Sequence, residues 1–124
     1  MSGSALAQEA AAVRAACGAD RSHVEMRACL EAKADASSRE LRSAQNEMRK
    51  LLAAADQEPT HIKRSISEFN SSVKQFSRFR TQQCEFIASL AAGGNGQDDL
   101  RLSCLYELNG QRIAQIKQVR ELVK

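Results

Sequence analysis

Two long segments of the chain carry an apolar position every three or four residues, and this pattern most constrains the fold. The spacing alternates between four and three residues, which is typical of a helix that packs along its length on a partner. The first stripe is Leu30, Ala34, Ser37, Leu41, Ala44, Met48, Leu51 and Ala55. The second stripe is Ile62, Ile66, Phe69, Val73, Phe76, Arg80, Gln83, Ile87 and Leu90. We therefore expect two long helices of about 30 residues, each roughly 45 Å long.

Few residues in the chain can end a helix, and they stand between the expected helices. The chain has one proline and six glycines. Pro59 is expected to open the second long helix, because proline is tolerated in the first turn. The glycine-rich segment 93–96, with Gly93 and Gly94, is expected to end that helix. So few turn residues also argue against a β-sandwich or barrel, which needs many turns.

Capping signals and a third stripe complete the predicted architecture. Ser22 and Glu25 form a capping-box pattern, so the first long helix should begin near His23. Asp98 and Asp99 suit the positive start of a third long helix. Its apolar positions are Leu102, Leu105, Leu108, Ile113, Ile116, Val119 and Val123.

Together these signals predict one all-α domain over residues 1–124. We expect an elongated antiparallel bundle of three long helices with a short N-terminal helix at residues 5–16. Residues 1–4 are expected to be an irregular start or a remnant of cloning.

The four cysteines form two pairs with long spacings. Eleven residues separate Cys17 from Cys29, and nineteen separate Cys84 from Cys104. Zinc sites need close pairs such as C-x-x-C, so we expect two disulfides, no metal and no cofactor. Pairing neighbours would fasten the N-terminal helix to the bundle and close the glycine-rich turn, although four cysteines allow three pairings. Disulfides mark oxidising compartments, which favours a periplasmic or secreted protein.

With this cysteine pattern, the chain resembles the LprI-type lysozyme inhibitors, a family of small secreted or periplasmic helical proteins. The resemblance covers about residues 17–113. Besides the cysteines, it rests on Glu25, Met26, Leu41, Phe76, Phe79, Arg80, Gly93, Gly94 and Arg112. The chain departs from the family pattern at Phe76, where tryptophan is usual, and at Gln45, Ser72, Thr81 and Asn109. The resemblance implies a binding protein that inhibits lysozyme.

The sequence contains no catalytic constellation. Only His23 and His61 could titrate near neutral pH, and neither stands with a cysteine or serine in an arrangement that suggests a nucleophile. Glu31 and Asp35 are one turn apart but lie among basic residues, as on a salt-bridged helix surface. We therefore expect a protein that is not an enzyme.

Residues 60–83 are basic, with five cationic side chains against one glutamate, Glu68. The five are Lys63, Arg64, Lys74, Arg78 and Arg80, of which Lys63, Arg64 and Arg78 are candidate binding residues. A basic stripe can bind lipid A, anionic glycan or nucleic acid, but a solvated helix face is commoner, and nucleic acid is not favoured. The helical spacing of Phe69, Phe76 and Phe79 predicts that these rings lie in the core.

Two arginines and two aspartates need separate interpretations. Arg80 and Arg112 interrupt apolar stripes, so we expect each to lean inward and pair with a carboxylate or with helix carbonyls rather than bind a ligand.

Lysozymes are typically basic, so a basic inhibitor needs a local acidic element. Asp98 and Asp99 are the candidates for that element, with helix capping as the competing interpretation.

The remaining signals concern location and partners. No stretch reaches the about 20 apolar residues that span a membrane. The triplet at residues 5–7 has the small-x-small form of a signal-peptidase site, although an alanine-rich helix start looks the same. We expect the partner to be a lysozyme or another envelope protein. The alternative is an envelope structural or interaction module, whose heptad stripes recruit a partner helix or a second copy of the chain.

Overall fold

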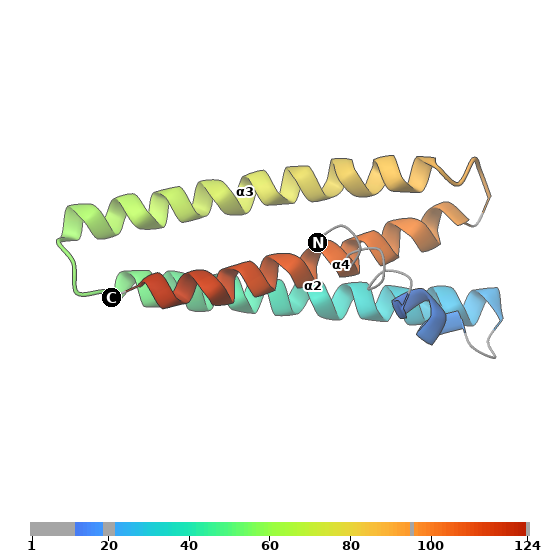
Figure 1. The fold of residues 1–124 in the computed structure, drawn as a ribbon, viewed down its shortest axis with the longest axis horizontal. Coiled ribbons are helices and arrows are strands. Elements are labelled where there is room, and N and C mark those ends of the chain that lie inside the picture. The colour runs from blue at the N-terminus through green and yellow to red at the C-terminus, as the bar shows by residue number, and fades with distance from the viewer. Residues whose placement is uncertain (1–11, 19–21, 95, 124) are drawn as a thin grey trace.

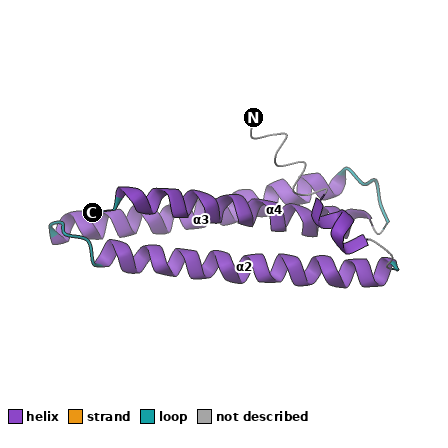
Figure 2. Ribbon diagram, turned by 60° about the horizontal axis from the view of Figure 1, so that its bottom comes forward, coloured by secondary structure: helices purple, strands orange, loops and turns teal. Residues whose placement is uncertain are grey.

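The computed structural model describes residues 12–18, 22–94 and 96–123. It shows three long helices in an elongated bundle (Figure 1): α2 over His23–Ala53, α3 over Pro59–Ser89 and α4 over Gly96–Val119. Residues 12–18 form a short additional helix, and the 3-10 helix Arg120–Leu122 follows α4. All regular structure within the described residues is helical (Figure 2), which confirms the predicted all-α bundle. The predicted helix residues 5–11 lie outside the described residues.

The start of α2 confirms the predicted helix signals. The Ser22 hydroxyl accepts a hydrogen bond from the Glu25 backbone amide at 3.3 Å, which satisfies one of the free amides of the first turn. At the start of α3, Pro59 follows the N-cap residue Glu58, where its missing N–H removes no helical hydrogen bond.

The turn between α3 and α4 requires left-handed backbone. Ala92, Gly93 and Gly94 have φ angles of 49°, 96° and 78°. Glycine adopts such angles without the steric cost that a side chain brings, so the two glycines can reverse the chain here. Asp98 and Asp99 then lie in the first turn of α4, at its positive end.

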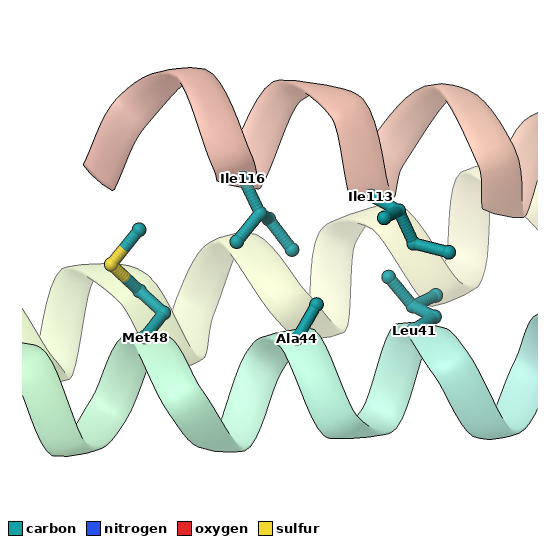
Figure 3. Packing of buried hydrophobic residues seen from close by; sticks show 5 residues of the cluster. All are labelled: Leu41, Ala44, Met48, Ile113 and Ile116. Carbon is teal, nitrogen blue, oxygen red and sulfur yellow. The ribbon is translucent and has the colours of Figure 1, made fainter. Parts of the chain in front are cut away.

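The main core lies between α2 and α4. Figure 1 shows α3 running antiparallel to both α2 and α4, and α4 packs most closely on α2. Five buried side chains form the centre of the core (Figure 3): Leu41, Ala44, Met48, Ile113 and Ile116. From α3, Phe69 and Phe76 cover this cluster as partly buried neighbours.

Both disulfides join cysteines that are neighbours in the sequence. Cys17 pairs with Cys29 and Cys84 with Cys104, each with a Cα–Cα distance of 5.5 Å. The first bond fastens the helix at residues 12–18 to α2, and the second links the end of α3 to α4. The two predicted disulfides are therefore confirmed, and of the three pairings that four cysteines allow the structure has the local one.

Several apolar residues expected in the stripes are exposed instead. In α2, Leu51 is 41% exposed, and Leu52 packs on the core. A straight helix repeats every 3.6 residues, so a strict seven-residue pattern drifts off the buried face along a long helix. Leu90 and Val119, at the ends of their helices, are also exposed.

The prediction that Phe79 lies in the core is wrong. Its ring is 53% exposed, because the inward position on this turn of α3 belongs to Arg80. The bundle covers α3 on one side only, and Cys84 and Ala88 are its two buried side chains.

Within the described residues, no helix is long and apolar enough to cross a bilayer.

Candidate functional site

A buried polar cluster crosses the middle of the bundle and centres on Asn109 of α4. Its side chain is fully buried, and the amide nitrogen donates to the hydroxyls of Ser37 and Ser38 on α2 at 3.0 and 3.1 Å. The amide oxygen accepts a 2.7 Å hydrogen bond from Arg80 Nη1 on α3. One side chain therefore joins all three long helices, and this requires them to keep one register.

Beside this cluster, two guanidinium groups lie against one aromatic ring. The Cζ atoms of Arg80 and Arg112 are each 5.6 Å from the centroid of the Phe76 ring, within the range of cation–π attraction. Arg112 Nη2 also donates to the Ser72 hydroxyl at 3.0 Å. Burial lowers the pKa of both arginines, which nevertheless stay cationic at neutral pH.

Both arginines lean inward as the sequence predicts, but the acceptors differ from the expected ones. The two hydrogen bonds end on an amide oxygen and a hydroxyl oxygen, not on carboxylates or helix carbonyls. These acceptors and the aromatic ring stabilise the two cations.

Ion pairs connect the helices at the glycine-rich end. Arg101 donates to the Glu85 carboxylate at 2.9 and 3.0 Å and to Asp98 at 2.6 Å. The second oxygen of Asp98 lies 3.3 Å from Arg27 on α2. The hydrogen bond from Arg101 lowers the pKa of Glu85, and the same bond raises the pKa of Arg101.

The two candidate aspartates occupy different environments. The Asp98 side chain is 49% exposed at the end of the bundle. Asp99 is buried, and its Oδ2 lies 3.7 Å from His23 Nδ1 at the start of α2. Of the two, Asp98 is therefore the one that a partner could contact directly.

The basic candidates lie on the exposed side of α3. Lys63, Arg64, Lys74 and Arg78 are all exposed, and none of them has an ion pair with another described residue. Lys63 and Lys74 border a shallow hollow of about 390 Å³, whose other lining residues are Ile66, Ser67, Asn70 and Ser71. The structure thus separates the candidate binding residues into an acidic end and a basic helix face.

Two features were missed in the sequence. Asn109 lies four residues before Ile113, at the spacing of the α4 stripe, and this polar interruption was the available signal. Phe86 is 56% exposed and follows Phe79 by seven residues, a second repeat offset from the main stripe of α3.

Among the described residues, no three His, Cys, Asp or Glu side chains are grouped so that they could hold a metal ion.

One comparison with known proteins gives a match. A family model, described as lysozyme inhibitor LprI, matches residues 14–116. Neither the curated proteins nor the solved structures contain a match to this chain. The matched range includes both disulfides, the Asn109 cluster and the glycine-rich turn.

Proposed function

Because the chain belongs to the LprI family of lysozyme inhibitors, we propose that it binds a lysozyme and inhibits it by protein–protein contact. The observation that carries this proposal is the family match, which spans most of the chain. The proposal needs no catalytic residue, since a bound protein blocks an enzyme by covering its site. Two disulfides support a periplasmic or secreted location, where a lysozyme would be met.

The end of the bundle between α3 and α4 fits such a contact best. We call Glu85, Ala92–Gly94 and Asp98 the acidic tip. Glu85 and Asp98 have side chains 56% and 49% exposed, and the turn residues between them are exposed as well. Both carboxylates already pair with Arg101, but their exposed oxygens can still accept hydrogen bonds from basic groups of an enzyme surface, and hydrogen bonds to charged groups are the stronger ones.

The acidic tip is also held in place before any partner arrives. Arg101 bridges Glu85 and Asp98, and the disulfide Cys84–Cys104 links the two helices beside the turn. A preorganised binding element loses less conformational freedom on association, so more of its contact energy contributes to affinity.

Lysis of bacterial cell walls by c-type and g-type lysozymes tests the proposal. With the oxidised protein in excess, we expect lysis to slow and the effect to saturate. Glu85→Gln with Asp98→Asn should weaken inhibition, because the pair removes both carboxylates without changing side-chain size. Glu31→Gln with Asp35→Asn removes the same charge from α2 and should leave inhibition unchanged. Unchanged lysis at high excess would contradict the function, whereas equal losses in both pairs would contradict only the acidic tip.

A second candidate function is an envelope interaction module without lysozyme inhibition. The observation that favours it is the exposed aromatic surface of α3, where Phe79 and Phe86 are more than half exposed. Exposed aromatic side chains in one row mark contact surfaces. Sedimentation velocity with and without envelope extracts would support this function if a complex forms while lysis rates stay unchanged.

A further inference from the structure

One side of α3 carries a strip of hydrogen-bond donors in the first half of the helix. The shallow hollow of about 390 Å³ on this side is lined by Lys63, Ile66, Ser67, Asn70, Ser71 and Lys74. We call its five polar members, all but Ile66, the donor strip. The polar members recur at spacings of three and four residues, which keeps them on one side of the helix.

The two lysines at the ends of the donor strip lack a countercharge. Lys63 and Lys74 are exposed, and neither has an ion pair with a described residue. No carboxylate is among the described residues that line the hollow. Within residues 63–74 the one acidic residue is Glu68, which follows Ser67 directly and is therefore turned by about 100° around the helix. The lining of the hollow thus attracts an anion and offers it no negative neighbour.

The two serines of the donor strip keep their hydroxyl groups free for a ligand. Within a helix, serine and threonine commonly donate to a backbone carbonyl three or four residues earlier. Ser72, Thr81 and Ser89 of α3 do so at 2.6–3.1 Å. Ser67 and Ser71 make no hydrogen bond with a described residue.

Asn70 also presents a donor, and Arg49 of α2 fixes the orientation of its amide. Arg49 Nε donates to Asn70 Oδ1 at 2.8 Å. A guanidinium group has no acceptor, so the oxygen must be the atom that faces Arg49, and the NH₂ group lies on the other branch of the amide. This NH₂ group has no hydrogen bond with a described residue. Arg49 also adds a positive charge next to the hollow.

The chemistry and the length of the donor strip indicate the ligand. Carboxylates are best recognised by the paired donors of arginine, whereas lysine binds phosphate as a point charge. Lys63 and Lys74 are eleven residues apart, which is about 16 Å along the helix axis. One phosphate group contacts only part of that length, so phosphates that repeat along one chain match it better. None of the six lining residues is aromatic, so the bases of a nucleic acid would find no ring to stack on.

We propose that the donor strip binds a linear chain of phosphate groups. The two lysines attract the chain, and the serine hydroxyls and the Asn70 NH₂ group donate hydrogen bonds to its oxygens. Arg78 follows Lys74 by four residues and extends the same side of the helix by one turn. This binding does not depend on lysozyme inhibition, because the acidic tip lies at the other end of α3.

Isothermal titration calorimetry of the oxidised protein, without lysozyme, tests the proposal. The probes are inorganic polyphosphate, polyglutamate and single-stranded DNA, matched in net charge. We expect polyphosphate to bind most tightly, and its affinity to fall as salt increases because screening reduces the attraction. No binding of polyphosphate would overturn the proposal and leave a solvated helix face. Equal binding of polyglutamate, or tighter binding of the DNA, would overturn it as well.

Asn70→Asp tests the donor strip with the least change in shape. The variant keeps an oxygen acceptor for Arg49 but replaces the NH₂ donor with a negative oxygen. The fold should therefore persist while polyphosphate binding is lost. Gln115→Glu makes the net charge more negative by the same amount on α4 and should bind nearly as well as wild type. Equal losses in the two variants would contradict the site.

The serines separate hydrogen bonding from net charge. Ser67→Ala with Ser71→Ala leaves the net charge unchanged and should weaken polyphosphate binding about fivefold. Ser43→Ala with Ser89→Ala removes two exposed hydroxyls elsewhere and should leave binding unchanged. Full affinity in the first pair would overturn the donor strip, because simple attraction to a basic surface does not need hydroxyl groups.

The lysines locate the charge that matters. Lys63→Gln with Lys74→Gln should weaken binding about fivefold for each lysine. Lys33→Gln with Lys117→Gln removes the same charge from α2 and α4 and should have little effect. Thermal unfolding checks that every variant folds, which the exposed positions favour. Equal losses in the two lysine pairs would overturn the proposal in favour of attraction to the whole molecule.

Discussion

At the scale of single residues, Asn109 illustrates how a polar group can specify the arrangement of a bundle. Its amide donates to α2 and accepts from α3, while its own backbone belongs to α4. Apolar side chains tolerate small shifts along a helix, but these hydrogen bonds do not, since their geometry is narrow. The cluster therefore selects one alignment of the three helices.

Replacing Asn109 should lower the stability of the folded protein. Asn109→Ala removes the acceptor of Arg80 and the donor to two serine hydroxyls, which leaves buried polar groups unpaired. We expect the free energy of unfolding to fall by about 3 kcal/mol in urea denaturation. Gln115→Ala, an exposed change on the same helix, should stay within about 0.5 kcal/mol of wild type. A similar loss in both variants would contradict the role given to Asn109.

The Glu85–Arg101 pair should make stability depend on pH in the acidic range. Arg101 lowers the pKa of Glu85 below its ordinary value of 4.5 in the folded chain. The pair therefore stabilises the fold above about pH 4.5, and this contribution is lost as the pH falls through the lowered pKa. The Tm of wild type should exceed that of Glu85→Gln at neutral pH, and the difference should vanish in acid. Glu68 does not pair with Arg101, so the difference in Tm between wild type and Glu68→Gln should not depend on pH in this way.

The sequence predicted the inward arginines but not their surroundings, for a physical reason. Polar residues that interrupt a stripe signal burial, so Arg80 and Arg112 could be found by periodicity. Their acceptors lie on other helices, and the pairing depends on how those helices rotate and slide. Periodicity within one helix does not contain that information, and so Asn109 was missed.

At the scale of elements, helix ends were more predictable than helix faces. Ser22 and Pro59 act on their own local backbone, and α2 and α3 begin at the positions that these residues predict. Which side of α3 is buried depends on its neighbours instead. Phe79 was therefore misplaced, because the bundle covers α3 on one side only.

The oxidation state of the cysteines belongs to this scale too, because each disulfide joins two elements. All four cysteines of the chain are paired. We expect the unfolded, unreduced protein to react with no thiol reagent, and the reduced protein to react at all four positions. Free thiols before reduction would contradict both the pairing and the oxidising compartment.

Replacing one disulfide should measure its contribution to stability. Cys84→Ala with Cys104→Ala opens a loop with a sequence separation of 20 residues. We expect the free energy of unfolding to fall by about 3 kcal/mol, because the bond restricts the unfolded chain. Chemical denaturation of the variant beside the oxidised wild type provides the measurement, and a change near zero would contradict this account.

At the scale of the whole molecule, the bundle is a rod rather than a sphere. α2 and α3 each have 31 residues, which corresponds to about 46 Å of helix. A compact chain of 124 residues would have a radius of gyration of about 14 Å. Because the bundle is elongated, small-angle X-ray scattering should give a larger value than this. A radius of gyration of about 14 Å would contradict the elongated bundle, because that value belongs to a compact, roughly spherical chain of this length.

Both disulfides lie near the same end of this rod, where α2 begins, α3 ends and α4 begins (Figure 1). The opposite end, around the connection from α2 to Pro59, has no disulfide and is held by noncovalent contacts, such as the hydrogen bond from Arg49 to Asn70. Opening of the native state should therefore start there, so its amides should exchange hydrogen with solvent sooner and its connection should be the first site cut by a protease. The helices would separate first at the end without disulfides, while the two disulfides keep the helices together at the other end.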